Sequence, residues 1–392
     1  MKKLKLGIIG IGNMGSSHAR NITQGKCPEI EITAIADINP ERLEWAKEQG
    51  YGEGVQYFDD GIKMLDSGLV DSCLIAVPHY DHTSLAIECI NRGIHVMLEK
   101  PAGVYTKQVL EMNEVAESHP EVVFGMMFNQ RTNCVYRKLR ELVKSGKYGE
   151  IRRTNWLITT WYRPQAYYNS GGWRATWAGE GGGALLNQCP HQLDLWQWIC
   201  GMPSKIHAHL HYGKWHDIEV EDDVTAYVEY PNGATGVFIT STGDAKGTNR
   251  FEIQMDKAKF VVDNDELTMY EYEMTEQEFS KTNTKPFGNV KIEEVPVETD
   301  GLNLGHPGVL NAWADAILNG GEMTADGREG INGLTISNAM HLSSFLNKEI
   351  TLPIDHELYY EELMKRVASS KKKEVVSTGF ASADDVMGST KS

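Results

Sequence analysis

The stretch LKLGIIGIGNMG, residues 4–15, decides the fold of this 392-residue chain. Its apolar first half, residues 4–9, predicts a buried strand, and a helix is expected directly after the glycines. Gly10, Gly12 and Gly15 form a G-x-G-x-x-G pattern, which carries weight only in such a strand–loop–helix context. Gly10 permits a tight turn, and Gly12 lets the backbone approach a pyrophosphate at the helix N-terminus. The stretch predicts a dinucleotide-binding βαβ unit, with a glycine turn that binds no cofactor as the alternative.

A carboxylate follows the second predicted strand, residues 31–36. Asp37 stands at its end, where a carboxylate accepts hydrogen bonds from both hydroxyls of an adenosine ribose. It also repels a 2′-phosphate, which favours NAD over NADP. Arg42 is close in sequence and weakens this preference, since an arginine accommodates a phosphate. The predicted cofactor is NAD.

The βα pattern then repeats with short connections, as it does in a doubly wound parallel sheet. Further strands are predicted over residues 71–77, 95–98 and 122–128, and helices over 40–49, 61–67, 83–92, 106–118 and 135–144. The sequence therefore predicts an α/β Rossmann domain over residues 1–128.

The segment VMLEKPAG, residues 96–103, places polar groups at the carboxyl edge of this sheet, where ligands bind in open α/β folds. Lys100, held by the proline after it, is expected to reach both the nicotinamide ribose and a substrate hydroxyl. Other polar residues follow neighbouring strands. The predicted cofactor-binding residues are Gly10, Gly12, Asn13, Met14, Gly15, Asp37, Pro78, His82, Glu99, Lys100 and Asn129.

The second half of the chain has the alternating pattern of antiparallel strands. Residues 151–161 predict one long antiparallel strand, and residues 275–299 are polar and expected to form an excursion or a loop. Strands are predicted over 206–212, 223–230, 234–240, 250–255, 259–263 and 267–272, and helices over 309–319 and 330–346. This predicts an α+β domain over residues 129–367 with a large open, mainly antiparallel sheet, and a polar tail over 368–392. A wide sheet with an apolar second face predicts a homo-oligomer.

An aromatic cluster begins this second domain. Tyr162, Arg163 and Trp173 belong to it, and such side chains stack on sugar rings and bind their hydroxyls. The alternative is a packed cover at a protein interface.

The segment GEGGGALLNQCPHQ, residues 179–192, follows the cluster, and its glycines are expected to let the backbone run close to a ligand. Pro190 begins a predicted helix that places His191 in its first turn, where the helix dipole lowers the histidine pKa and favours a neutral base. His306, at another helix start, is expected either to face the site or to cap its helix.

The composition excludes several classes of binding partner and site. The formal net charge of −16 argues against nucleic acid and anionic membranes. The six cysteines include no C-x-x-C pair, which favours reduced thiols and a cytoplasmic protein. No apolar run is long enough for a transmembrane helix, and no histidine–carboxylate spacing is typical of a metal site.

These motifs together resemble the Gfo/Idh/MocA oxidoreductases. The residues that carry the resemblance are Gly10–Gly15, Asp37, Val77-Pro78 with His82, Glu99-Lys100-Pro101, and Gly181-Gly182-Gly183 followed by His191 and Asp194. The resemblance implies NAD(P)-dependent oxidation or reduction of a sugar or cyclitol carbinol. It assigns catalysis to Lys100, which binds the nicotinamide ribose and the reacting hydroxyl, and to His191, the general base in oxidation. Asn187 stands where the family commonly has Asp, and an amide orients a hydroxyl but takes no proton.

Within the family, residues 161–194 are most similar to glycoside 3-dehydrogenases, which implies oxidation of the C3 hydroxyl of a pyranoside. An inositol dehydrogenase is the closest alternative, and a non-catalytic regulator that senses NAD or sugar is the alternative of another class. The predicted substrate-binding residues are Lys100, Tyr162, Arg163, Trp173, Asn187, His191 and His306.

Overall fold

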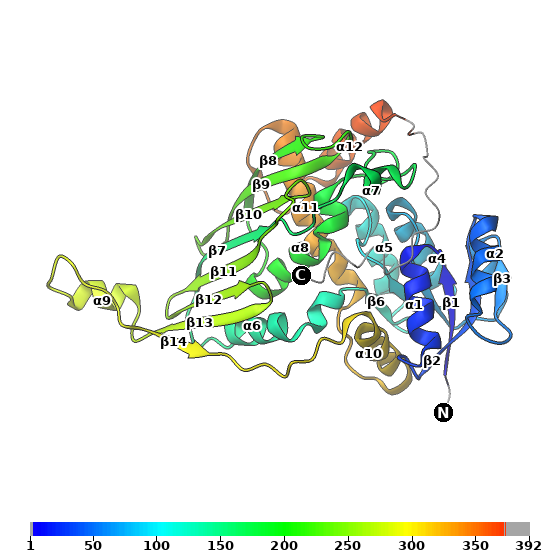
Figure 1. Ribbon diagram of the computed structural model, residues 1–392, viewed down its shortest axis with the longest axis horizontal. Coiled ribbons are helices and arrows are strands. Elements are labelled where there is room, and N and C mark those ends of the chain that lie inside the picture. Colours follow the sequence, from blue (N-terminus) through cyan, green and yellow to red (C-terminus); the bar gives the residue numbers. More distant parts are fainter. Residues whose placement is uncertain (1–2, 372, 374–392) are drawn as a thin grey trace.

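The computed structural model describes residues 3–371 and 373, which form two sheets lying side by side (Figure 1). The first has six parallel strands in the order β3-β2-β1-β4-β5-β6. They are β1 (Leu4–Ile9), β2 (Ile30–Ala36), β3 (Gln56–Phe58), β4 (Ser72–Ile75), β5 (His95–Leu98) and β6 (Phe124–Met126). The strand order reverses between β1 and β4, so a ligand crevice is expected at their carboxyl ends.

The helices of this half are α1 (Asn13–Thr23), α2 (Pro40–Gln49), α3 (Gly61–Leu65), α4 (His82–Asn91) and α5 (Thr106–Ser118). The predicted doubly wound parallel sheet is thus confirmed. The sequence pattern missed β3 because it is a three-residue edge strand with no buried residue.

One late helix returns to this first half. In α10 (Gly305–Asn319), Val309 and Trp313 are buried in the same apolar cluster as Leu6 and Ile8 of β1. The division of the chain at residue 128 therefore separates the two sheets, but α10 packs with the first one.

The second sheet has nine strands in the order β14-β13-β12-β11-β7-β10-β9-β8-β15. They are β7 (Ile151–Ile158), β8 (Lys205–Tyr212), β9 (Glu221–Glu229), β10 (Thr235–Ser241), β11 (Asn249–Met255), β12 (Ala258–Asp263), β13 (Glu266–Tyr272), β14 (Ile292–Pro296) and β15 (Ile350–Thr351). The open, mainly antiparallel sheet is confirmed. One detail was wrong: β7 is antiparallel to β11 but parallel to β10, because β10 enters beside it from a hairpin with β9.

Residues 275–299, expected to form an excursion or a loop, form an excursion that has regular structure. It contains α9 (Glu276–Thr282), which a capping box between Thr275 and Glu278 begins, and β14, which pairs with β13. This arm projects beyond the rest of the sheet at the left of Figure 1. Neither α9 nor β14 buries a side chain fully, so their sequences lack the periodic apolar residues that would have predicted a helix or a strand.

Helices of the same chain cover the apolar face of the second sheet. They are α6 (Cys134–Lys144), α8 (Pro190–Cys200) and α11 (Gly330–Leu346). Trp156 of β7 stacks on Phe251 of β11 beneath them, with ring centroids 4.2 Å apart. The expectation of an uncovered apolar face is therefore wrong.

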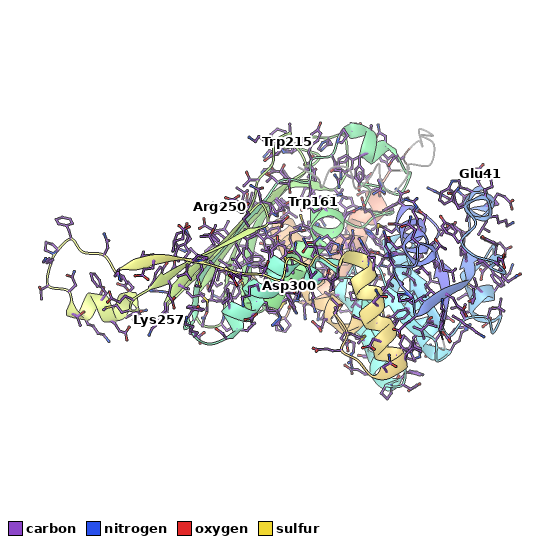
Figure 2. The ribbon with its side chains drawn as sticks, turned by 60° about the horizontal axis from the view of Figure 1, so that its bottom comes forward. Glu41, Trp161, Trp215, Arg250, Lys257 and Asp300 are labelled. Carbon is purple, nitrogen blue, oxygen red and sulfur yellow. The ribbon has the colours of Figure 1, made fainter. Side chains whose placement is uncertain are left out.

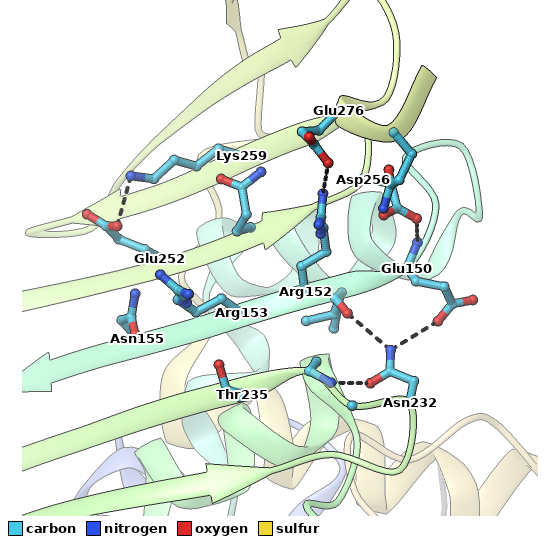
Figure 3. Close-up of a pocket in the computed structure, with 15 residues that line it drawn as sticks. Glu150, Arg152, Arg153, Asn155, Asn232, Thr235, Glu252, Asp256, Lys259 and Glu276 are labelled. Atoms are coloured by element: carbon cyan, nitrogen blue, oxygen red, sulfur yellow. Dashed lines mark hydrogen bonds and ion pairs between the residues drawn. The ribbon is translucent and has the colours of Figure 1, made fainter. Parts of the chain in front are cut away.

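The opposite face of this sheet is open and charged (Figure 3). It holds a hollow of about 820 Å³ between β7, β10, β11 and β12, whose lining includes Arg152, Arg153, Glu252, Lys259 and Glu276. None of the predicted site residues lines this hollow.

The remaining helices are α7 (Gln165–Asn169) and α12 (His356–Ser369). The latter continues into the predicted tail, of which residues 372 and 374–392 lie outside the described part. Over the ranges described, no helix has the length and apolar character needed to cross a bilayer. All six cysteines are buried and have free thiols.

Candidate active site

The loop between β1 and α1 has the shape that a dinucleotide requires. Gly10 has a φ of +89°, and a Cβ there would lie 2.5 Å from the carbonyl oxygen of Ala76, which directly follows β4. A Cβ on Gly15 would lie 1.9 Å from the carbonyl oxygen of Gly10, so α1 packs directly on the loop. Gly12 differs, because no atom of the described residues other than its chain neighbours lies within 4 Å of its Cβ position. The open space beside Gly12, at the start of α1 where Asn13 and Met14 lie, fits a pyrophosphate.

Asp37 lies beside this loop and fits an adenosine ribose. Its Oδ2 accepts a hydrogen bond of 2.9 Å from the backbone N–H of Ile11, and its Oδ1 accepts one of 2.9 Å from that of Asn39. These bonds fix the carboxylate and leave each oxygen further lone pairs for a ribose hydroxyl. The charge of Asp37 also acts on Arg42, whose pKa burial lowers, so the two side chains are neighbours.

Asn129 lies on the short helix after β6, at the same sheet edge. Its Oδ1 is buried and has no hydrogen-bond partner among the described residues. A buried amide oxygen without a partner is costly, so a ligand is its natural partner. The residues of the crevice therefore fit the predicted cofactor.

Lys100 joins the two halves of the molecule. It follows β5, and its Nζ donates a hydrogen bond of 3.0 Å to the backbone carbonyl oxygen of Asn187 in the second half. Burial lowers the pKa of Lys100, and the carboxylate of Glu99 opposes that shift. This contact between the two halves thus holds an ammonium group at the carboxyl edge of the first sheet.

Glu99 anchors this strand end. Its Oε1 accepts a hydrogen bond of 2.7 Å from His18 Nε2, and its Oε2 accepts one from the backbone N–H of Lys100. Burial raises the pKa of Glu99, but His18, then His306 and Lys100, outweigh it and hold that pKa at about 2. The carboxylate is therefore charged and committed to protein partners, whereas the sequence assigned it to the cofactor.

His191 has the protonation state of a base. It lies in the first turn of α8, and its Nδ1 is buried with no partner among the described residues. Burial, and next the charge of Lys100, lower the pKa of His191 to about 3, so its imidazole is neutral. The predicted lowering is confirmed, but its main cause is burial rather than the helix dipole. The influence of Lys100 on this pKa also means that the two side chains are neighbours.

His306 supplies a further imidazole near Lys100 and Glu99. It lies in the first turn of α10 and packs edge-on against His18, with ring centroids 5.2 Å apart. Burial, then the charge of His18, lower the pKa of His306 to about 4. Lys100 and Glu99 also act on that pKa, which places His306 beside the site rather than only at a helix end.

His82, the last residue of the Pro78–His82 segment, serves the fold. Both ring nitrogens of His82 are engaged with carbonyl oxygens, Nδ1 with Pro101 at 2.7 Å and Nε2 with Val77 at 2.9 Å. The ring is buried and ties the end of β4 to the end of β5. His82 therefore has no nitrogen left for the predicted cofactor contact.

In the predicted substrate cluster, arginine guanidinium groups lie over the faces of aromatic rings. Arg163 lies 5.0 Å from the ring centre of Tyr167, and Arg174 lies 4.5 Å from Tyr167 and 4.6 Å from Trp173. Tyr162 is exposed, and Arg163 and Arg174 both act on the pKa of Lys100. In Figure 2, Trp161, next to Tyr162, lies between Arg250 of the second sheet and Glu41 of the first domain. Trp173 of this cluster also packs edge-on against His79 of the first half, with ring centroids 5.7 Å apart, so the cluster contacts both halves.

The glycine run before Asn187 approaches protein, not only a ligand as expected. A Cβ on Gly183 would lie 2.0 Å from the carbonyl oxygen of Glu221, and one on Gly181 would lie 2.2 Å from Val104. The carboxylate of Glu221 accepts backbone N–H bonds of 2.9 Å from Gly183 and Leu185. This buried carboxylate holds the run in place.

Sequence reasoning missed Glu180. Its side chain is 2% exposed, and its carboxylate accepts hydrogen bonds from Asn187 Nδ2 and from the backbone N–H of Ala175. The signal in the sequence was an isolated acidic residue inside the run GEGGG. Asn187, which stands where the family commonly has Asp, is thus hydrogen-bonded to a buried carboxylate.

Two family models match the chain. Residues 4–126 match the oxidoreductase family with an NAD-binding Rossmann fold, and residues 136–261 match the GFO/IDH/MocA C-terminal domain. Among known proteins, the rhizopine catabolism protein MocA of Rhizobium meliloti is 29% identical over 202 residues. That match covers 51% of this chain and 58% of MocA, so only part of that relative is represented.

Other relatives match over longer stretches. D-glucoside 3-dehydrogenase of Escherichia coli is 29% identical over 253 residues, covering 59% of this chain and 68% of that enzyme. Myo-inositol 2-dehydrogenase of Thermotoga maritima is 25% identical over 270 residues, covering 67% and 75%. The solved structure of the WlbA dehydrogenase from Chromobacterium violaceum, in complex with NADH and UDP-GlcNAcA, is 26% identical with a TM-score of 0.77, covering 91% of this chain and 97% of that one. With both domain models matched, the chain belongs to the Gfo/Idh/MocA family of oxidoreductases and has its NAD-binding Rossmann fold.

Proposed function

We propose that this protein is an NAD-dependent dehydrogenase that acts on a ring carbinol of a sugar or glycoside. The observation that carries the proposal is the hydrogen bond by which Lys100 Nζ reaches Asn187 of the second half, four residues before the buried imidazole of His191, whose pKa the charge of Lys100 helps to lower. When bound, NAD would accept the hydride of the carbinol in oxidation and supply it in reduction.

The residues of the chain hold the sugar and move its proton. Lys100 donates a hydrogen bond to the reacting hydroxyl oxygen and stabilises negative charge on it. His191, neutral at physiological pH, accepts the hydroxyl proton in oxidation and returns it in reduction. Asn187 and His306 bind further hydroxyls, and the ring lies against Tyr162, Arg163 and Trp173.

The cofactor is held by the loop of Gly10, Gly12 and Gly15, by the start of α1, and by Asp37. Asn129 contributes its buried amide oxygen. The fixed carboxylate of Asp37 supports a preference for NAD over NADP.

For the substrate, we propose the C3 hydroxyl of a pyranoside. The similarity to D-glucoside 3-dehydrogenase and the stacking surface of the aromatic cluster support it. The similarity to a myo-inositol 2-dehydrogenase favours a cyclitol as the second candidate. Reduced buried thiols support a cytoplasmic enzyme, and the open charged face of the second sheet supports a homo-oligomer.

A substrate panel tests this proposal. Purified protein is incubated with NAD⁺ and with alkyl glucosides, aryl glucosides or free inositols, while NADH absorbance is followed. We expect turnover with glucosides, a 3-keto product by NMR, and none with the 3-deoxy glucoside. Turnover with inositols alone would reject the glycoside assignment.

The Lys100→Ala variant separates an enzyme from a regulator. Turnover is expected to fall by about 100-fold or more, because the reacting hydroxyl loses its donor, while NADH binding measured by fluorescence persists. Wild-type protein that binds NADH and sugar without any turnover would identify a regulator instead.

A further inference from the structure

Hydrogen bonds connect three residues from the site inward. Lys100 Nζ donates to the carbonyl oxygen of Asn187, and Asn187 Nδ2 donates to Glu180 Oε1. The second carboxylate oxygen, Oε2, accepts the backbone N–H of Ala175, and the backbone carbonyl of Glu180 lies 3.3 Å from His79 Nδ1. The carboxylate is therefore held from both sides.

The position of Glu180 demands a reason. Its side chain is 2% exposed, and no described residue forms an ion pair with it. Burying a carboxylate without an ion pair costs several kcal/mol in general. Accordingly, burial raises the pKa of Glu180, against the charge of Arg174 and the bonds from Ala175 and Asn187. A buried titratable group with a shifted pKa beside a ligand crevice is characteristic of a functional site.

We propose that Glu180 is a positioning residue of this site, which acts through the side chain of Asn187 on the orientation and charge of Lys100. This rests on the proposed dehydrogenase function. An amide whose Nδ2 donates to Glu180 is fixed in one orientation, which leaves its Oδ1 as acceptor for a substrate hydroxyl. The same contact holds the backbone carbonyl that receives Lys100 Nζ.

The charge of Glu180 also acts on Lys100 directly. The carboxylate raises the pKa of Lys100 against the lowering that burial causes, and so favours the ammonium form. Glu180 thus supplies the negative charge that an Asp at position 187 would carry, since this chain has the uncharged Asn187 there. The charged and titratable groups around the two residues are His79, His82, Glu99, Arg163, Tyr168, Arg174, Cys189, His191, Glu221, His306 and Lys373.

Substitutions that exchange charge between the two positions test this. Glu180→Gln keeps the shape and removes the charge, and Asn187→Asp sets two carboxylates against each other. The double variant E180Q/N187D restores an amide–carboxylate pair with the charge moved to position 187. Asp222→Asn is the matched control, because Asp222 is an equally buried carboxylate that holds the backbone of Lys214 and Trp215.

We expect Glu180→Gln to lower kcat by about tenfold or more, with KM and the Kd for NADH within about threefold of wild type. The basic limb of the kcat–pH profile should shift to lower pH, since Lys100 loses its proton more readily. The double variant should recover most of the kcat, and Asp222→Asn should lower Tm without moving the profile. An unchanged kcat and profile in Glu180→Gln would overturn the proposal. If Glu180→Gln does not fold, the double variant decides: turnover above that of Asn187→Asp supports the proposal, and turnover no higher overturns it.

A second readout needs no turnover. The rate at which Lys100 reacts with an amine-specific acylating reagent is measured against pH by peptide mass spectrometry, in wild type and Glu180→Gln without substrate. A shift of the Lys100 titration to lower pH supports the link even if no sugar is turned over, in which case only the dehydrogenase assignment fails. A titration that does not move in a folded variant overturns the link itself.

Discussion

At the residue scale, Lys100 and His191 respond differently to the same burial. Burial lowers the pKa of both. The carboxylate of Glu99 opposes this shift in both residues, and for Lys100, the next residue in the chain, it is the largest influence after burial. For His191, the charge of Lys100 adds to the effect of burial. A hydrogen-bond donor and a neutral proton acceptor can therefore stand side by side at one carbinol.

The same burial makes the stability of the protein sensitive to acid. The pKa values of His191 and His306 fall from the ordinary value of 6.5 to about 3 and about 4. Below pH 6.5 the unfolded chain binds protons that the folded protein does not, so stability is lost as the pH falls from 6.5 through those values. Each histidine contributes a slope of at most about 1.4 kcal/mol per pH unit. When the unfolding free energy is measured with urea between pH 7 and 4, its dependence on pH should be weaker in His306→Gln than in wild type.

The exposed histidine His209 on β8 provides the control for this measurement. The His209→Gln variant is unfolded under the same conditions, and the three proteins are compared. An equal slope in wild type and His306→Gln would contradict the prediction.

At the scale of elements, the β1–α1 connection contains glycines with two different tasks. Gly10 is needed for folding, because its φ is positive and its Cβ position meets the backbone of Ala76. Gly12 has a φ of −70°, which any residue adopts, and open space at its Cβ position. Only ligand binding requires a glycine there.

The two alanine variants of this loop should therefore separate folding from binding. Gly12→Ala is expected to keep the wild-type Tm and to raise the Kd for NADH about tenfold or more, because the methyl group fills the pyrophosphate site. Gly10→Ala should lower the free energy of unfolding by about 2 kcal/mol or more. Thermal unfolding and NADH fluorescence titrations measure both. A Gly12→Ala protein that binds NADH like wild type would remove the loop from the proposed cofactor site.

At the scale of the whole molecule, the second sheet presents one covered face and one open face. The open face carries both signs of charge, including Arg153, Glu252 and Lys259, and two copies related by a two-fold axis can pair such groups. Arg153 is exposed on β7, the middle strand of this sheet, between Gln254 and Thr235. Its charge lies where a partner copy would make contact.

Reversal of this charge should weaken assembly. For Arg153→Glu we expect the Kd of self-association to rise by about tenfold or more, with the thermal stability of the single chain kept. Light scattering over a protein dilution series measures it. Lys63→Glu, at an exposed position on the first domain, is the control and should assemble as wild type does. Equal masses for wild type and Arg153→Glu at every concentration would exclude this face.

The sequence by itself determined the elements whose causes are local. The glycine loop, Asp37 after β2, the helix that begins at Pro190, and the apolar strands of the first sheet are set by backbone sterics and by the spacing of apolar residues. The strand His95–Leu98 and the helix Thr106–Ser118 were therefore predicted to the residue.

Only the tertiary structure decided which groups meet. The pairing of His18 with Glu99 spans 81 positions, and the contact between Lys100 and Asn187 spans 87. The parallel pairing of β7 with β10 and the return of α10 to the first sheet are equally non-local. Burial, which sets the pKa of His191 and gives Glu180 its place behind Asn187, depends on surfaces brought together from both halves. No local pattern encodes such a contact, because its free energy comes from removing both partners from water at once.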